Sequence, residues 1–280
     1  MRILVTGANG QLGSELRSVA SVDYIFTDIE ELDICDEGAV AEYVERNQID
    51  TIVNCAAYTN VDRAEDEPEV AERVNSEAVG VLARVARSYN ARLIHISTDY
   101  IFGGARCDRP INESAMPAPL GMYGSTKLMG ERAIEESGCD YIIIRTSWLY
   151  STYGKNFVKT ILRLATERDM LRVVNDQIGS PTYAKDLAGV IKQICDRQDF
   201  EGGVYHYSNR GEISWCDFAQ AIVEIGGAKC RVVPCTTAEY GAKAPRPPYS
   251  VLDTSKICER LGCDIPDWRV SLAECIKQML

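Results

Sequence analysis

Tyr123 and Lys127 lie in the segment Tyr-Gly-Ser-Thr-Lys, at the four-residue spacing that places two side chains on one face of a helix. A phenol there can protonate the alkoxide that develops when a hydride adds to a carbonyl group. Lowering the phenol pKa from about 10 to neutrality takes roughly 4 kcal/mol, which a lysine ammonium and a nicotinamide cation could supply jointly. The pair indicates acid catalysis in a carbonyl reduction. Taken alone, the same pattern also fits a solvated tyrosine and lysine on a helix surface.

Three glycines follow the first apolar run at the spacing of a dinucleotide-binding turn. Gly7, Gly10 and Gly13 come directly after residues 3–6 and open a segment with helical spacing. In such a turn the first glycine allows the tight bend, the second lets backbone amides approach a pyrophosphate, and the third lets the helix pack closely on the sheet. The helix N-terminus favours the anion. The motif predicts a bound dinucleotide, against the alternative of an ordinary glycine-rich turn.

Asp28 stands 21 residues after Gly7, at the end of the second apolar run. An acidic side chain at this place can accept hydrogen bonds from an adenosine ribose and would repel a 2′-phosphate. No basic residue follows it in 29–31, so the local charge favours NAD over NADP, although Arg2 or Arg17 could compensate. The alternative is an ordinary solvated residue at a strand end.

Thr98 ends the buried run His-Ile-Ser-Thr, at the edge where parallel sheets collect their catalytic groups. Its hydroxyl could donate to the same carbonyl oxygen as Tyr123. His95 stands three positions earlier, and therefore on the opposite face of a strand. We expect Thr98 to act on the substrate and His95 to be a core histidine with satisfied hydrogen bonds.

The first half of the chain alternates short β-branched runs with segments of helical spacing. This alternation is typical of βαβ units with a parallel sheet covered on both faces. It predicts an α/β fold with a doubly wound parallel sheet. The expected strands are 3–6, 24–27, 51–54, 93–97 and 141–145, and the expected helices are 11–20, 37–46, 70–89 and 123–137.

Beyond about residue 148 the pattern is less regular. A helix at 184–197 and a strand at 204–207 are expected, and 242–249 is expected to be an ordered loop, because its three prolines remove donors and fix φ. The simplest architecture is a smaller lobe closing over the first. We assign residues 1–148 and 182–208 to the dinucleotide-binding domain, and residues 149–181 and 209–280 to the smaller, substrate-binding lobe.

Composition excludes several classes of protein. With 46% hydrophobic and 25% charged residues among 280, the chain can bury a sizeable core, which excludes intrinsic disorder and a disulfide-stapled miniprotein. The net charge of −11, without a Lys/Arg cluster, disfavours nucleic acid as a partner. No apolar run reaches the length of a membrane span, and the first strand follows Met1 too closely for a signal peptide. We therefore expect a cytoplasmic protein without a membrane segment.

The eleven cysteines contain no CxxC pair, and the two histidines, His95 and His206, are far apart. Neither arrangement matches a zinc site, so no metal site is expected. Without an export signal, we expect the cysteines to be reduced and mostly buried.

Several segments resemble a known family, the extended short-chain dehydrogenases/reductases with a Ser/Thr, Tyr, Lys triad, and within it the dTDP-4-dehydrorhamnose reductases. They span nearly the whole chain: 54–65 (NCAAYTNVDRAE), 97–102 (STDYIF), 145–150 (RTSWLY), 176–182 (DQIGSPT) and Arg246-Pro247.

The resemblance implies a Rossmann fold and the reduction, by NADH or NADPH, of the 4-keto group of dTDP-4-dehydro-L-rhamnose. It makes Thr98, Tyr123 and Lys127 the catalytic triad. Besides Tyr123, Lys127, the glycines and Asp28, it implies cofactor contacts from Gln11, Leu12, Asp33, Ile34, Ala57, Tyr58 and Thr59. The implied substrate-binding residues are Val61, Thr98, Asp99, Tyr100, Trp148, Asn156 and Arg246, with Arg246 a partner for the diphosphate on charge grounds. For Tyr100 and Trp148 the alternative is core packing.

Tyr100 also separates this chain from the related nucleotide-sugar dehydratases, which carry a glutamate at that position for eliminating water. Cys55, where the family usually has alanine, is a departure outside the chemistry. Some relatives bind magnesium between subunits; Glu15 could be one ligand, but its partners do not align, so a magnesium requirement and the choice between monomer and homodimer stay open. The other functions that fit are reduction or epimerisation of another nucleotide-linked 4-ketosugar, and a non-catalytic regulatory subunit of the same fold.

Overall fold

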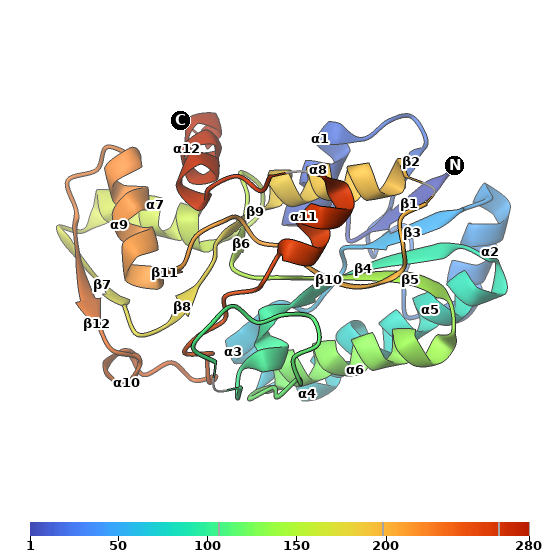
Figure 1. Ribbon diagram of the computed structural model, residues 1–280, viewed down its shortest axis with the longest axis horizontal. Helices are drawn as coiled ribbons and strands as arrows, with labels where there is room; N and C mark the ends of the chain where they lie inside the picture. Colours follow the sequence, from blue (N-terminus) through green and yellow to red (C-terminus); the bar gives the residue numbers. More distant parts are fainter. Residues whose placement is uncertain (106, 198, 263, 280) are drawn as a thin grey trace.

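The computed structural model describes residues 1–105, 107–197, 199–262 and 264–279, and within them a six-stranded parallel sheet forms the centre of the molecule (Figure 1). Its strands run in the order β10-β5-β4-β3-β1-β2. Ile3 pairs with Tyr24 on one side and with Thr51 on the other, so the strand order reverses at β1. A crevice at such a reversal is where open α/β sheets bind ligands. The strands are β1 (Ile3–Thr6), β2 (Tyr24–Phe26), β3 (Thr51–Asn54), β4 (Arg92–Thr98), β5 (Asp140–Thr146) and β10 (Gly203–His206).

Helices cover both faces of the sheet because successive strand residues point to opposite sides. Val5 and Ile94 pack in one apolar cluster with Leu16 of α1, whereas Leu4 and Leu93 pack in another with helices of the other face. In Figure 1 the two sets of helices lie on either side of the strands. The doubly wound prediction is confirmed. One face carries α1 (Gln11–Val19), α8 (Ala184–Cys195) and α11 (Ser255–Leu261), and the other carries α2 (Glu37–Asn47), α5 (Ala78–Ser88) and α6 (Met122–Ser137).

The helix expected over 70–89 is present but not uniform. It begins as α4 (Pro68–Glu72), passes through a π-helical turn, η1 (Arg73–Glu77), and continues as α5. The wider turn puts Asn75 in the interior of the protein, fully buried against α6. Gly130 of α6 permits this contact, since a Cβ there would collide with the carbonyl oxygen of Asn75. Single π-helical turns are frequent at functional sites.

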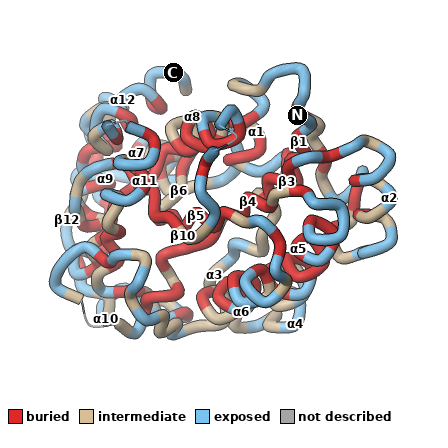
Figure 2. Tube along the Cα trace, turned by 45° about the vertical axis from the view of Figure 1, so that its right-hand side comes forward, coloured by how far each residue is buried: buried red, intermediate tan, exposed pale blue. Residues whose placement is uncertain are grey.

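The second lobe is more regular than the sequence suggested. Its core contains Ile161, Phe218 and Leu272, each from a different helix around the parallel strand pair β7 and β12. In Figure 2 the buried parts of the trace follow the strands of the main sheet and the helix turns that face each core. The elements are α7 (Phe157–Glu167), α9 (Trp215–Ile225), α10 (Thr237–Tyr240), α12 (Trp268–Met279), β7 (Met170–Val174) and β12 (Arg231–Cys235). Among the short strands, β6 (Leu149–Tyr150) pairs with β9 (Thr182–Tyr183) across the boundary of the lobes, whereas β8 (Ile178–Gly179) pairs with β11 (Ile213–Ser214) within the second lobe.

Helix α11 belongs in its packing to the large sheet, although its sequence lies within 209–280. Ile257 and Leu261 are buried in the same cluster as Tyr205 of β10, and Lys256 Nζ donates to Val204 O at 2.6 Å. The chain thus returns to the first lobe near its end.

The loop 242–249 is irregular, as its prolines predicted, and its end is held by Ile178 N donating to Pro248 O. No helix among the described residues has both the length and the apolarity to cross a membrane.

Candidate active site

The turn between β1 and α1 has the geometry that its glycines predict. Gly7 adopts a φ of 65°, and a Cβ there would lie 2.5 Å from Ala56 N of the neighbouring turn after β3. A Cβ on Gly13 would lie 2.6 Å from Gly7 O. The N-cap of α1, Gly10, makes no side-chain cap hydrogen bond, so the first backbone N–H groups of the helix are available to an anion. This arrangement fits a dinucleotide pyrophosphate.

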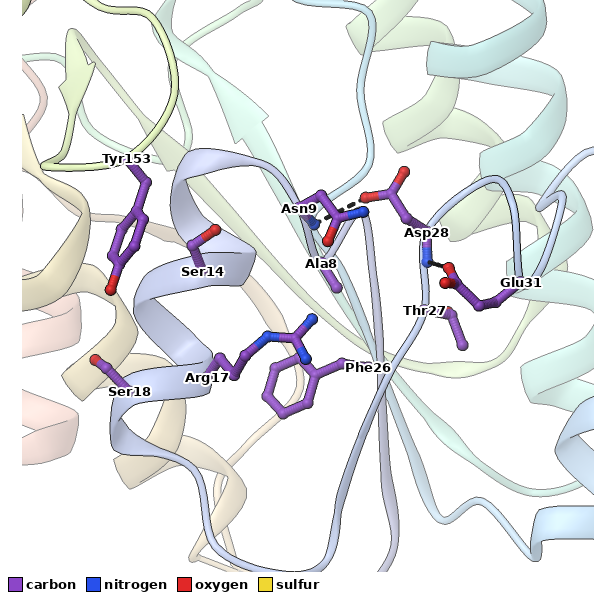
Figure 3. Close-up of a pocket in the computed structure, with 10 residues that line it drawn as sticks. All are labelled: Ala8, Asn9, Ser14, Arg17, Ser18, Phe26, Thr27, Asp28, Glu31 and Tyr153. Atoms are coloured by element: carbon purple, nitrogen blue, oxygen red, sulfur yellow. Dashed lines mark hydrogen bonds between the residues drawn. The ribbon is translucent and has the colours of Figure 1, made fainter.

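A cavity of about 580 Å³ lies beside this turn (Figure 3). Asp28 Oδ2 accepts from Asn9 N at 2.8 Å, which ties the end of β2 to the glycine turn. The guanidinium of Arg17 lies over the ring of Phe26, 4.5 Å from its centroid, and faces the same cavity. Arg2, the other basic residue considered above, instead donates to Asn47 O. Of these two basic residues, Arg17 is therefore the one that lines the same cavity as Asp28.

The remaining expected cofactor residues surround the crevice in different ways. The side chain of Leu12 is buried in one apolar cluster and that of Ile34 in the other. These residues could therefore contact a ligand through their backbone groups. Asp33 accepts from Cys35 N at 2.9 Å. Gln11 Oε1 accepts from Asn156 Nδ2 at 2.9 Å, which joins the start of α1 to the second lobe.

Asn75, which was not among the expected site residues, hydrogen-bonds to the turn Ala57-Tyr58-Thr59. Tyr58 N donates to Asn75 Oδ1 at 2.9 Å, and Asn75 Nδ2 donates to Tyr58 O at 3.0 Å and to Thr126 Oγ1 at 3.2 Å. The π-helical turn thus fixes the turn after β3 against the helix that carries Tyr123. The one available signal was a polar residue on the apolar side of a helical pattern.

Thr98, Tyr123 and Lys127 come together at the carboxyl end of β4 and the start of α6. Thr98 Oγ1 lies 3.1 Å from Asp99 Oδ1, and its hydroxyl also interacts with the Tyr123 phenol, so its single proton can be donated to only one of the two at a time. The rings of Tyr100 and Tyr123 meet edge to face, with centroids 5.3 Å apart. Burial raises the pKa of Tyr123 to about 12, and the Thr98 hydrogen bond opposes that rise. The phenol is therefore protonated at neutral pH, as a proton donor must be.

Lys127 is almost fully buried beneath this group. Its Nζ donates to Ile96 O at 2.7 Å and lies 3.0 Å from His95 Nε2. Burial lowers the pKa of Lys127 to about 8, with the Glu131 carboxylate acting in the opposite direction. His95 is a buried core histidine with partners on both ring nitrogens, as predicted, but it also contacts the catalytic lysine.

A second cavity, of about 780 Å³, opens between the lobes on the other side of Tyr100. Tyr100 and Arg246 line it, as expected of substrate-binding residues. Arg246 Nη2 donates to Asp62 Oδ2 at 2.9 Å, directly after Val61 at the start of α3 (Val61–Ala64). Other residues that line this cavity were not expected from the sequence. They include the aromatic side chains of Phe157 and Trp215 and the guanidinium groups of Arg168 and Arg172.

Trp148 and Asn156 support this wall and are not among the residues that line it. Trp148, at a φ of 47°, stacks on Trp215 with ring centroids 3.7 Å apart. Asn156 caps α7, accepting from Lys159 N at 3.1 Å.

Asp99 is buried beside Thr98, and burial raises its pKa to about 6. Its Oδ2 has no hydrogen-bond partner within the described chain. Asp99 is not among the residues that line the cavity between the lobes, so its expected contact with the substrate stays a prediction.

Glu15 is buried on α1, and its Oε1 accepts from Ser151 Oγ at 2.6 Å. That contact fits a link between the lobes better than a metal ligand shared between subunits. Across the described ranges, no group of three or more His, Cys, Asp or Glu side chains could hold a metal ion.

Residues 1–280 match the family described as the RmlD substrate binding domain. A dTDP-4-dehydrorhamnose reductase from Burkholderia thailandensis is 40% identical over 100% of this chain and 99% of its own length. The chain belongs to the dTDP-4-dehydrorhamnose reductase family.

Solved structures of the family agree with this fold. A dTDP-4-dehydrorhamnose reductase from Clostridium acetobutylicum superposes with a TM-score of 0.94 at 39% identity, covering 100% of this chain and 99% of its own. The reductase from Bacillus anthracis, in complex with NADP, gives a TM-score of 0.93 at 39% identity, with 99% of each chain covered. Family membership confirms the resemblance in the sequence and the Rossmann-like fold of the extended reductases.

Proposed function

We propose that this protein reduces the 4-keto group of dTDP-4-dehydro-L-rhamnose with NADH or NADPH, giving dTDP-L-rhamnose in the last step of its synthesis. The observation that carries the proposal is the position of Thr98, Tyr123 and Lys127. They meet at the carboxyl end of β4 and the start of α6, next to Tyr100, which lines a cavity with arginine and aromatic side chains. Membership of the reductase family supports it.

The cofactor would be held at the crevice where the strand order reverses. Backbone N–H groups at the start of α1 face its pyrophosphate, and Asp28 accepts from its adenosine ribose. Asp28 favours NADH, while Arg17 gives the same cavity a cation that can meet the 2′-phosphate of NADPH. The other proposed contacts are Gln11, Leu12, Asp33, Ile34, Ala57, Tyr58 and Thr59.

The catalytic step follows from the protonation state of the site. The bound nicotinamide supplies a hydride to C4 of the sugar. Tyr123 donates its phenolic proton to the C4 oxygen, and Thr98 orients that oxygen by a hydrogen bond. The raised pKa of Tyr123 keeps the phenol protonated until the substrate oxygen becomes strongly basic. Lys127 lies one helical turn beyond Tyr123 and would donate to the ribose of a bound nicotinamide cofactor.

The smaller lobe, 149–181 and 209–280, would bind the nucleotide. Arg246, which lines the cavity, would bind the diphosphate, and the aromatic side chains beside it would stack on the base. Asp99 would accept from a sugar hydroxyl through its unpartnered Oδ2. Val61 would border the sugar, and Trp148 and Asn156 would support the wall of the cavity from behind.

We also propose a cytoplasmic location and a monomer or homodimer. The buried cysteines in the described part of the chain, Cys139, Cys195, Cys216, Cys230, Cys235 and Cys275, are free thiols, which suits a reducing compartment.

The test is to follow NADH and NADPH absorbance when the purified protein meets dTDP-4-dehydro-L-rhamnose made in place by the upstream enzymes. The proposal predicts stoichiometric oxidation of the cofactor and formation of dTDP-L-rhamnose. If the cofactor binds but is not consumed, the chain is a regulatory subunit or acts on another sugar. Consumption with a product of different stereochemistry would reject the proposed substrate alone.

A further inference from the structure

Glu65, the residue at which α3 ends, reaches the start of α6, the helix that carries Tyr123. Its Oε1 accepts from Met122 N at 2.7 Å, and Met122 is the first residue of α6 and the neighbour of Tyr123. The N-cap of this helix, Gly121, makes no side-chain cap hydrogen bond. A carboxylate 57 positions away in the sequence therefore satisfies an N–H group that the helix itself leaves without an acceptor.

The contact depends on a glycine at the N-cap. An ideal Cβ on Gly121 would lie 2.6 Å from Glu65 Oε1, so a larger residue would push the carboxylate away from Met122 N. The backbone of Gly121 is extended, with a φ of −135° and a ψ of 174°, a conformation open to any residue. The glycine is thus explained by the space it leaves for the carboxylate and not by its backbone conformation.

The same first turn of α6 also packs closely against the turn that follows β4. An ideal Cβ on Gly124 would lie 2.5 Å from Tyr100 O, which belongs to the 3₁₀ turn η2 (Asp99–Phe102). Tyr123 therefore stands between one residue held by Glu65 and another packed against η2. Because the residues of a helical turn move together, a shift at the Glu65 end would move the phenol relative to its hydroxyl partner at the end of β4.

The short helix α3 also holds the loop 242–249 on the other side of this junction. Asp62 Oδ2 accepts from Arg246 Nη2 at 2.9 Å. Pro245 of the same loop approaches the start of α6, since its Cδ would lie 3.7 Å from an ideal Cβ on Gly121. Two carboxylates three positions apart thus connect the helix of the proton donor to the loop that lines the inter-lobe cavity.

We propose that Glu65 is a positioning residue for Tyr123, whose carboxylate holds the first turn of α6 at a fixed place relative to the loop that carries Arg246. The inference rests on the proposed function, in which Arg246 binds the diphosphate and Tyr123 protonates the sugar oxygen. The substrate fixes the distance between these two groups, so the protein must hold Arg246 and Tyr123 at a matching separation. Asp62 fixes the first of them and Glu65 the second.

The alternative role is that of a helix cap that contributes only to stability. Removing such a cap would lower the free energy of unfolding and leave the turnover of bound substrate unchanged. A positioning residue gives a different pattern. When it is lost, kcat falls while the KM values change little, because the groups that bind cofactor and substrate stay in place.

The test is a double-mutant cycle with Glu65→Ala and Gly121→Ala. The first substitution deletes the carboxylate, and the second adds a methyl group where the carboxylate lies. We expect each to lower kcat by about tenfold to a hundredfold, with the KM values for NADPH and the sugar nucleotide within about twofold of wild type. Because both act on one contact, the double variant should lose no more than either single variant. Glu65→Gln keeps an acceptor for Met122 N and should restore most of the turnover. Glu69→Ala, at an exposed acidic residue of α4, is the matched control.

A second measurement does not depend on turnover. In ¹³C NMR of protein labelled at the tyrosine Cζ, the signal of Tyr123 is the one lost in Tyr123→Phe. We expect it to shift or broaden in Glu65→Ala and Gly121→Ala, and to keep its place in Glu65→Gln and Glu69→Ala. An unchanged signal with unchanged kcat in Glu65→Ala would overturn the proposal, as would additive losses in the double variant.

Gly121→Ala decides if Glu65→Ala does not fold, because the added methyl group meets only the flexible end of a side chain at short range. An unchanged Tyr123 signal in that variant would then overturn the proposal. A wild-type protein that does not turn over the sugar would reject the proposed function alone, and the Tyr123 signal would still test whether Glu65 positions this residue.

Discussion

Asp62 and Arg246 are 184 positions apart in the sequence and are joined by a hydrogen bond of 2.9 Å at the edge of the inter-lobe cavity. The carboxylate belongs to α3, next to the cofactor turn, and the guanidinium to the proline-rich loop. Ala244 N also donates to Asp62 Oδ1, at 3.0 Å. The loop is thus fixed to the first lobe with Arg246 facing the cavity.

Arg246→Ala should weaken dTDP binding by about tenfold to a hundredfold, since a hydrogen bond to a charged group contributes roughly 1.5–3 kcal/mol. Asp62→Asn should weaken it less, because the arginine remains but loses its ionic partner. Isothermal titration calorimetry with dTDP measures both, and cofactor affinity should be unchanged. Lys243→Ala is the matched control in the same loop, since Lys243 forms an exposed ion pair with Asp66. Equal losses in Arg246→Ala and Lys243→Ala would contradict a specific role for Arg246.

Asp99 makes the stability of the fold depend on pH. Its pKa rises from 3.8 to about 6 on burial, so the folded state holds the proton more tightly than the unfolded state. The stabilising effect of that proton is complete below a pH of about 4 and is lost as the pH rises through about 6. Asp99→Asn cannot ionise. The variant should therefore gain about 1 kcal/mol relative to wild type between pH 5 and pH 8 in urea unfolding. If the difference in unfolding free energy between Asp99→Asn and wild type stays constant across this range, burial does not raise the pKa of Asp99.

Arg17 should decide how well NADPH is used. Removing it by Arg17→Ala takes away the cation near the 2′-position, so the KM for NADPH should rise by about tenfold while the KM for NADH changes by less than about twofold. Steady-state kinetics with both cofactors measures this ratio. Arg2→Ala is the control, because that side chain is bound to Asn47 O and should leave the ratio unchanged. If Arg17→Ala raises the KM values for NADPH and NADH equally, Arg17 does not bind the 2′-phosphate of NADPH.

The first lobe could be predicted because its signals are local. Each expected strand lies within one residue of an observed one, since a strand covered on both faces has a continuous apolar run bounded by turn residues. The segment 70–89 was correctly predicted as helical. Its π-helical turn was not, because the turn depends on Asn75 holding Tyr58, a contact across 17 positions that periodicity cannot reveal.

The second lobe was harder to predict because its sheet is not local. β7 and β12 pair although Met170 and Arg231 are 61 positions apart. In neither strand do apolar and polar residues alternate strongly. Helix α9 did carry a local signal: Ser214 and Asp217 form a capping box at its start. The aromatic wall of the cavity depends on how this helix meets α7, so Phe157 and Trp215 could not be selected from the sequence.

The glycine turn and the triad could be predicted because their chemistry fixes their spacing. The structure shows the close backbone approach at Gly7 and Gly13 that such a turn requires, and the roles of the triad stay predictions. The contact between His95 and Lys127 could not be predicted, since it joins residues 32 positions apart and forms only when β4 packs against α6.

The most direct test of the account is the turnover of Tyr123→Phe with dTDP-4-dehydro-L-rhamnose and NADPH, compared with wild type. Phenylalanine keeps the ring against Tyr100 and removes only the proton donor. We expect kcat to fall about 10²–10⁴-fold, because the proton donor is lost. The Kd of NADPH should stay within about twofold of the wild-type value. Turnover like that of wild type in a variant that binds the cofactor normally would contradict the central claim that Tyr123 protonates the sugar oxygen.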